Sequence, residues 1–230
     1  DPNRVMMVQF HQSYSYEDFI MGFRPSENGF KLKHGVFYEF CIRAEVDSDN
    51  DYFFIIDEIN RGNLSKIFGE LFMLLESDKR GVALQLLYAD EKFSIPENLY
   101  IIGMMNTADR SLAMLDYALR RRFAFFDLKP AFESDGFKSY QKDLNSDKFD
   151  KLIECIKRLN LAIKSDEILG AGFCIGHSYF CDLDKFEVDE LEAVLIRIVD
   201  FEIIPLLSEY WFDDVDMVNE WSNNLRSAIK

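Results

Sequence analysis

Four short apolar runs in the first half of the chain predict β-strands. The runs at residues 52–58 and 99–106 are almost continuously apolar, which is typical of strands that are buried on both faces of a sheet. Residues 4–10 and residues 124–128 are the other two candidates. Helical patterns separate these runs, and this alternation predicts an α/β domain with a mainly parallel sheet.

Helices and one hairpin are predicted between the strands. Apolar residues recur every three or four positions over residues 64–75, which predicts an amphipathic helix with Asn63 as its N-cap. Leucines within residues 112–119 mark another helix. Two short apolar runs within residues 82–95, joined by the turn-like sequence YADE, predict a hairpin.

The second half of the chain has a different pattern. A proline followed by a polar stretch near residue 130 marks a domain boundary. Beyond it the apolar spacing is helical over residues 149–163 and again over residues 188–207, where Pro205 is expected to bend or end the helix. We therefore expect an α/β core over residues 1–130 and a helical domain over residues 131–230.

Net charge limits the partners that the chain can bind. The 230 residues carry a net charge of −15, of which −10 falls after residue 130. An acidic surface is a poor non-specific binder of phosphate backbones. Any contact with nucleic acid is therefore expected from a local basic patch or from domains absent from this chain.

The cysteines and the hydropathy indicate the compartment. The four cysteines lack the spacing of a secreted disulfide scaffold, and we expect reduced thiols in a cytoplasmic protein. Cys174, His177 and Cys181 supply only three metal ligands without a paired C-x-x-C sequence, so a zinc site is not expected. No apolar run approaches the roughly 20 residues of a membrane span, and no membrane contact is expected.

The sequence FFIIDEINR carries the strongest chemical signal. Its apolar strand ends in Asp57 and Glu58, as in the Walker B element of P-loop NTPases. There the aspartate helps to hold Mg²⁺, and a following glutamate is placed to polarise the attacking water. The alternative is an acidic cap after a strand, with Glu58 only solvated.

A second strand ends in an amide, and a predicted helix ends in three cations. Asn106 follows Asp57 by 49 residues and, on a neighbouring strand, can bond to the γ-phosphate or the lytic water. The alternative is an Asx-turn residue. Residues 120–122 are arginines that either favour a helix C-terminus electrostatically or reach a neighbouring subunit's nucleotide as arginine fingers.

Longer strings of residues extend these signals. MVQFHQSYSYEDFI, FFIIDEINRGNLSKIFGELFMLLE, IIGMMNTADRSLAMLDYALRRRF and GFCIGHSYF resemble the McrB family over nearly the whole chain. This family comprises the AAA+ GTPase motor subunits of modification-dependent, 5-methylcytosine-specific restriction endonucleases. The resemblance implies an AAA+ P-loop NTPase core with a small helical lid domain.

The resemblance also implies roles for single residues. Asp57 and Glu58 match the Walker B pair, with Asp57 as the Mg²⁺ ligand and Glu58 as the catalytic base, and Asn106 matches the sensor 1 position. Arg110 belongs to the signature loop of the family. Arg121 and Arg122, in the family-specific string RRRF, match the interface arginines. His177 lies in a string that the family shares, and it either approaches the nucleotide or caps a helix.

The resemblance also implies cofactors and partners. The resemblance implies GTP and Mg²⁺, a homo-oligomeric ring that is a hexamer, and an McrC-like nuclease subunit that stimulates it. Methylated DNA would be recognised through a separate N-terminal domain. The ring would power DNA translocation and cleavage by the nuclease.

Two features depart from the family pattern. No G-x-x-x-x-G-K-[ST] phosphate loop occurs, so we expect the sequence to begin just after that loop and to lack the first strand of the sheet. In the AAA+ strand order 5-1-4-3-2 that strand is central, between residues 99–104 and 124–128. The second departure is Cys174, where a basic residue is more usual.

Two other functions remain open at this point. An ATP-using AAA+ remodelling protein of the MoxR or dynein-related kind would present the same Walker B and sensor positions. A non-hydrolysing assembly module is the alternative from a different class, because the chain lacks the backbone donors and the lysine of a phosphate loop.

Overall fold

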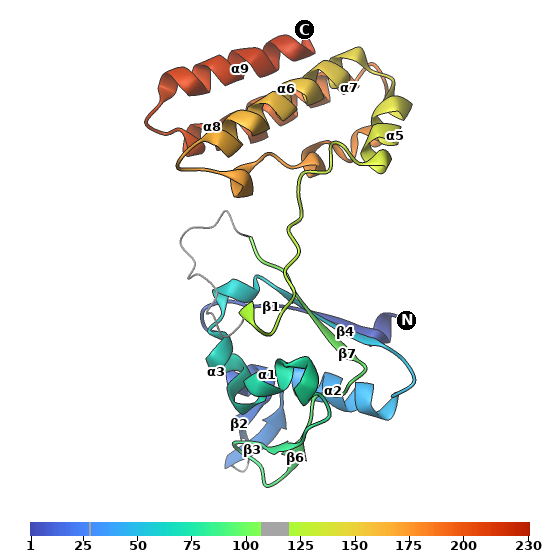
Figure 1. The fold of residues 1–230 in the computed structure, drawn as a ribbon, viewed down its shortest axis with the longest axis vertical. Helices are drawn as coiled ribbons and strands as arrows, with labels where there is room; N and C mark the ends of the chain where they lie inside the picture. Colours follow the sequence, from blue (N-terminus) through green and yellow to red (C-terminus); the bar gives the residue numbers. More distant parts are fainter. Residues whose placement is uncertain (28, 107–119) are drawn as a thin grey trace. The chain divides into compact units, whose positions relative to one another are not determined.

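The computed structural model describes residues 1–27, 29–106 and 120–230, which form two compact units, Asp1–Phe125 and Phe126–Lys230 (Figure 1). Each unit encloses its own cluster of buried hydrophobic side chains. The units are α/β and helical, respectively, as the sequence predicts.

A three-stranded parallel sheet forms the centre of the first unit. Its order is β1 (Val5–Gln9), β4 (Tyr52–Asp57), β7 (Leu99–Gly103), which confirms the strands predicted within residues 4–10, 52–58 and 99–106. Gln9 pairs with Asp57, and Ile56 pairs with Gly103. The carboxyl ends of all three strands therefore lie at one edge of the sheet.

The sheet is buried on one face only within the described residues, whereas the apolar runs predicted two buried faces. In β4, Phe54 and Ile56 are fully buried, but Phe53 is exposed on the other face. Phe53 stacks on Tyr100 of β7, and Ile102 is exposed beside them. Phe53, Tyr100 and Ile102 line a cavity together with Arg121 and Arg122, so the described residues cover this apolar face only in part.

The predicted strand at residues 124–128 does not form. Phe126 and Leu128 are 91% and 95% exposed, and the segment has no regular secondary structure. A strand needs a neighbour to accept its backbone hydrogen bonds. No strand of the described residues lies beside this segment, which explains the difference.

The predicted helix at residues 64–75 is divided at Gly69. It begins as α3 (Leu64–Phe68), with the Asn63 side chain accepting a hydrogen bond from the Lys66 amide, so the N-cap is confirmed. Gly69 has a positive φ of 53°, and the chain continues as the 3₁₀ segment η3 (Gly69–Leu75). A Cβ at Gly69 would lie 2.9 Å from the ring of Tyr16, so glycine also permits this close approach.

The remaining elements of the first unit were predicted only in part. The hairpin expected within residues 82–95 is present as two very short strands, and the predicted helix at residues 112–119 lies outside the described residues. The elements not predicted include an antiparallel hairpin and an eleven-residue helix. The bounds are α1 (Tyr16–Phe19), β2 (Met21–Ser26), β3 (Gly29–His34), α2 (Val36–Val46), β5 (Leu84–Gln85), β6 (Lys92–Phe93) and the 3₁₀ segments η1 (Pro2–Arg4), η2 (Ile59–Arg61) and η4 (Ser77–Lys79).

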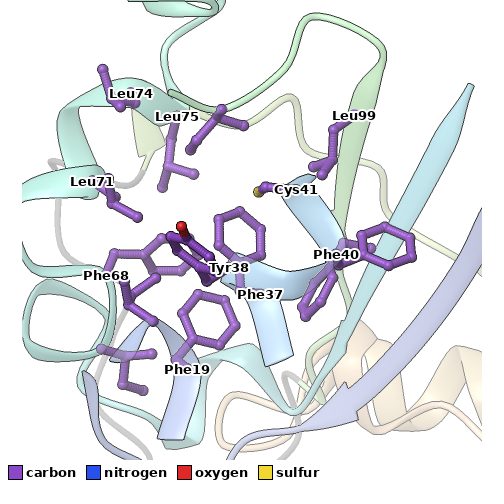
Figure 2. Close-up of a cluster of buried hydrophobic side chains, with 14 of the residues drawn as sticks. Phe19, Phe37, Tyr38, Phe40, Cys41, Phe68, Leu71, Leu74, Leu75 and Leu99 are labelled. Carbon is purple, nitrogen blue, oxygen red and sulfur yellow. The ribbon is translucent and has the colours of Figure 1, made fainter. Parts of the chain in front are cut away.

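Aromatic side chains dominate the core beneath the covered face of the sheet. Phe19 of α1 stacks on Phe37 of α2 with ring centroids 4.7 Å apart, and Phe68 contacts both rings edge-on. Figure 2 shows this cluster together with the leucines of η3. It anchors α1, α2 and α3 to the sheet and so fixes the loops at the carboxyl ends of the strands.

The second unit is a helical bundle. The predicted helix at residues 149–163 is confirmed as α6 (Asp147–Ser165), which packs against α9 (Val215–Ile229). The segment predicted at 188–207 forms a helix over residues 191–198, a π-helical turn over residues 199–203 and a helix over residues 204–210. The π turn lies just before Pro205, which has no N–H to donate to the preceding turn. The other bounds are α5 (Asp135–Leu144), η5 (Ala171–Phe173), η6 (His177–Phe180), η7 (Leu183–Lys185), α7 (Leu191–Ile198), η8 (Val199–Ile203) and α8 (Ile204–Tyr210).

Candidate functional site

Asp57 lies at the carboxyl end of the central strand β4, half-buried between two neighbours. One carboxylate oxygen accepts a hydrogen bond from the Glu58 amide at 3.0 Å. The other accepts one from the Gln9 side-chain amide at 3.2 Å, because the parallel register places Gln9 directly beside Asp57. The carboxylate is thus oriented by a neighbouring strand and by its own backbone.

Glu58 adopts a left-handed backbone conformation, with φ 51° and ψ 44°. This conformation is unfavourable for residues with a side chain and occurs often at functional sites. It ends the strand and starts the short turn η2. Within that turn the Arg61 guanidinium lies 3.1 Å from a Glu58 carboxylate oxygen, and the Arg61 amide donates to the Glu58 carbonyl at 2.9 Å.

The turn after β4 is tied to the segment after β7. The Met104 amide donates to the Ile56 carbonyl at 2.8 Å, and the Ile59 amide donates to the Met104 carbonyl at 2.9 Å. A Cβ at Gly103 would lie only 2.6 Å from the end of the Ile59 side chain, so glycine permits this close approach. Asn106 follows three residues later, exposed, beyond the same edge of the sheet as Asp57.

The two arginines that the resemblance places at a subunit interface lie elsewhere in the first unit. Arg121 and Arg122 line a cavity of about 1020 Å³, together with Glu76 and Tyr100. Neither Asp57 nor Glu58 lines this cavity. The structure therefore brings together the strand-end residues but does not bring these arginines to them, and Arg110 lies outside the described residues.

His177 belongs to the second unit. Its Nδ1 accepts a hydrogen bond from the Ala131 amide at 3.2 Å. Phe132 and Phe137 contact the imidazole edge-on. Nearby, burial raises the pKa of the Cys174 thiol.

Gln9 and Arg61 contact the acidic pair but were not singled out from the sequence. Gln9 is a polar residue at the end of an apolar strand, the same signal that drew attention to Asn106. Its partner was not predictable because the parallel register comes only from the fold. Arg61 lies three residues after Glu58, a spacing at which side chains meet within one helical turn.

The acidic pair suits a magnesium ion held jointly with a nucleotide. No group of three or more His, Cys, Asp or Glu side chains within residues 1–27, 29–106 and 120–230 is arranged to hold a metal by itself. Mg²⁺ is usually bound through one or two carboxylates together with substrate phosphates and water. The oriented carboxylate of Asp57 fits that requirement.

Comparisons with known proteins agree with this geometry. The AAA domain of the dynein-related subfamily matches residues 1–123, and the McrB alpha-helical lid domain matches residues 151–219. The chain is 51% identical to the Type IV methyl-directed restriction enzyme EcoKMcrB subunit of Escherichia coli, over 97% of the chain and 50% of that protein. It is 28% identical to the Type II restriction enzyme BsuMI component YdiS of Bacillus subtilis, over 70% of the chain and 53% of that protein.

The matched lengths define what the chain represents. It spans about half the length of both of these relatives. The AAA match ends at the close of the first unit, and the lid match lies within the second. The chain therefore belongs to the AAA family, dynein-related subfamily, and is an McrB homologue with an AAA core and a helical lid.

Proposed function

We propose that this chain is the GTP-hydrolysing part of the motor subunit of a modification-dependent restriction endonuclease. The observation that carries the proposal is the pair Asp57 and Glu58 at the carboxyl edge of a parallel sheet, beside the end of the strand that leads to Asn106. Nucleotides and Mg²⁺ bind at this edge of α/β sheets. The printed names of both relatives, which are restriction enzyme components, support the biological setting.

Each residue of the pair has its own proposed role. Asp57 holds Mg²⁺, with Gln9 and the Glu58 amide orienting its carboxylate. Glu58 accepts a proton from the water that attacks the γ-phosphate. Asn106 orients this water by hydrogen bonding. Bound Mg²⁺ neutralises the charge on the phosphate oxygens.

We propose that the residues that bind the nucleotide phosphates lie outside these 230 residues. The sequence has no G-x-x-x-x-G-K-[ST] motif, whose backbone amides and lysine supply most of the phosphate affinity in P-loop NTPases. The partly exposed apolar face around Phe53 and Tyr100 supports additional chain packing there. GTP binding thus belongs to the longer protein.

The assembly is proposed from the resemblance and from the arginine run. Subunits form a cytoplasmic ring, a hexamer, in which an arginine of one copy reaches the nucleotide of the next. An McrC-like nuclease subunit binds the ring, and DNA is recognised mainly by domains absent from this chain. The net charge of −15 supports the recognition of DNA by domains outside this chain.

Two alternatives are each favoured by one observation. The match to the dynein-related AAA subfamily favours an ATP-using remodelling protein. The missing phosphate-loop motif favours a non-hydrolysing assembly module. The nucleotide that is hydrolysed, and whether any is hydrolysed, separates these from the first proposal.

Steady-state hydrolysis by the full-length protein tests the proposal. With Mg²⁺ present, we expect turnover of GTP and little turnover of ATP. We expect Asp57→Asn to require a higher Mg²⁺ concentration, and the 230-residue chain alone to bind neither nucleotide at micromolar concentrations. Hydrolysis of ATP alone would favour the remodelling protein, and no hydrolysis of either nucleotide would favour the assembly module.

A further inference from the structure

The carboxylate of Glu58 is partly closed off from solvent. Glu58 directly follows the last residue of β4, yet its side chain is only 18% exposed. The carboxylate oxygen Oε2 is buried and accepts no hydrogen bond from the residues that the structure describes. A general base needs an oxygen within hydrogen-bond reach of the proton that it removes. In this arrangement Oε2 is not open to an attacking water.

Arg61 is the residue that contacts this oxygen. The Arg61 Nε lies 3.1 Å from Oε2 of Glu58, and the Arg61 side chain is 44% exposed. The guanidinium therefore meets a buried oxygen on one side and solvent on the other. Ion pairs between two exposed side chains contribute little to stability. This pair differs, because the carboxylate that it holds is mostly buried.

The backbone of the turn is fixed, so the pair separates by rotation of side chains alone. The Arg61 amide donates to the Glu58 carbonyl at 2.9 Å, and the Ile59 amide donates to the Met104 carbonyl at 2.9 Å. The Ile59 side chain between the two paired residues is buried. Rotation of partly exposed side chains is fast, and its main cost is the contact that it breaks.

A second acceptor in the same turn also lacks a donor. Asn60 lies between Ile59 and Arg61, and its Oδ1 is buried without a hydrogen bond from the described residues. Buried acceptors without a donor are uncommon in folded proteins, and each one requires an explanation. Two of them in one short turn indicate that the polar groups of this turn take other partners when the site is occupied.

We propose that Arg61 is a positioning residue that holds Glu58 in a resting position and thereby limits the basal rate of hydrolysis. Glu58 reaches the attacking water only after it separates from Arg61. The exposed guanidinium can then pair with another anion, and nucleotide phosphates bind at this same edge of an α/β sheet. The inference rests on the proposed function, in which Glu58 is the base, and adds a residue that restrains this base.

Carboxyl labelling of the full-length protein without nucleotide tests the pair independently of hydrolysis. A carbodiimide and an amine probe convert accessible carboxylates to amides, and mass spectrometry locates them. We expect Glu58 to react several-fold faster in Arg61→Gln than in the wild type. Arg61→Lys keeps the charge and should resemble the wild type. Asp47, which pairs with Arg4 at 3.3 Å, is the internal standard. Equal reactivity of Glu58 in the wild type and in Arg61→Gln would overturn the resting pair.

Single-turnover hydrolysis of GTP tests the effect on the base, because it reports the chemical step separately from product release. We expect Arg61→Gln to raise the rate about two- to fivefold, the factor that a partly exposed ion pair supplies, and Arg61→Lys to leave it near the wild-type value. Arg4→Gln is the matched control. It removes a comparable ion pair at the opposite end of β1 and should leave the rate unchanged.

A double variant shows whether Arg61 acts through Glu58. With Glu58→Gln present, Arg61→Gln should no longer raise the rate. A lower or unchanged rate for Arg61→Gln alone, or a rise that persists in the double variant, would overturn the proposal. Absence of hydrolysis in the wild type would contradict the proposed function instead, and the labelling experiment would still decide whether the resting pair exists.

Discussion

Glu58 keeps a left-handed backbone in a position where glycine would be the easier residue. The chain must turn sharply after β4, and Met104 holds that turn in place by accepting a hydrogen bond from the Ile59 amide and donating one to the Ile56 carbonyl of β4. A glycine there would satisfy the turn but would supply no carboxylate. The strain at this residue is consistent with selection for chemistry over stability.

Substitution at Glu58 separates strain from function. We expect Glu58→Gly to be more stable than Glu58→Ala by about 1 kcal/mol in free energy of unfolding, because a left-handed conformation costs roughly 1–2 kcal/mol for a residue with a Cβ. Chemical denaturation measures this difference. Both variants should have lost hydrolysis.

Asn145 offers the matched control. It has φ 46° at the end of α5, so Asn145→Gly should likewise be more stable than Asn145→Ala, with hydrolysis retained. Equal stability of the glycine and alanine variants at position 58 would contradict the strain.

At the scale of elements, the close packing of β7 against the turn after β4 links the two strand ends. Gly103→Ala would bring a Cβ to 2.6 Å from the Ile59 side chain, which is buried. We expect a destabilisation of about 1–3 kcal/mol, as is usual for overpacking, with reduced turnover because Glu58 precedes Ile59. Denaturation and steady-state kinetics measure both effects.

Ile59→Val tests the cause of that loss. It removes the methyl group that the new Cβ would meet. The double variant Gly103→Ala with Ile59→Val should be more stable than Gly103→Ala alone. A double variant that is less stable by the sum of the two single effects would show that this contact is not responsible.

The open side of β7 leads to a second prediction for elements. β4 has a strand on both sides, whereas β7 pairs with β4 alone among the described residues. In the isolated chain we expect amide hydrogens in residues 99–103 to exchange faster than those in residues 52–57. In the full-length protein the difference should disappear, because the first strand that the family resemblance implies would pair with β7. Equal protection in the isolated chain would contradict it.

At the scale of the whole molecule, the sequence allowed the architecture and the strand-end residues to be predicted, because both depend on local patterns. Uninterrupted apolar runs identified β4 and β7, and three- and four-residue spacing identified α6. The predicted helix is divided at Gly69. This division could not be predicted, because Gly69 lies close to Tyr16 only in the folded structure.

Other features depend on partners far away in sequence. The run at residues 124–128 has strand composition, but it lacks a neighbouring strand. The contact of Gln9 with Asp57 depends on parallel register. Arg122 pairs with Glu76 and lies over the ring of Phe72, and only the fold brings these residues together.

The most direct test of the proposed hydrolytic role is the turnover of Glu58→Gln in the full-length protein. The amide keeps the shape of the side chain but cannot accept a proton from water. We expect the rate of GTP hydrolysis to fall by roughly 10²–10⁴-fold while the Kd for GTP changes little. Unchanged turnover at saturating GTP would contradict the role of Glu58 as the base and, with it, the assignment of this edge of the sheet as the catalytic site.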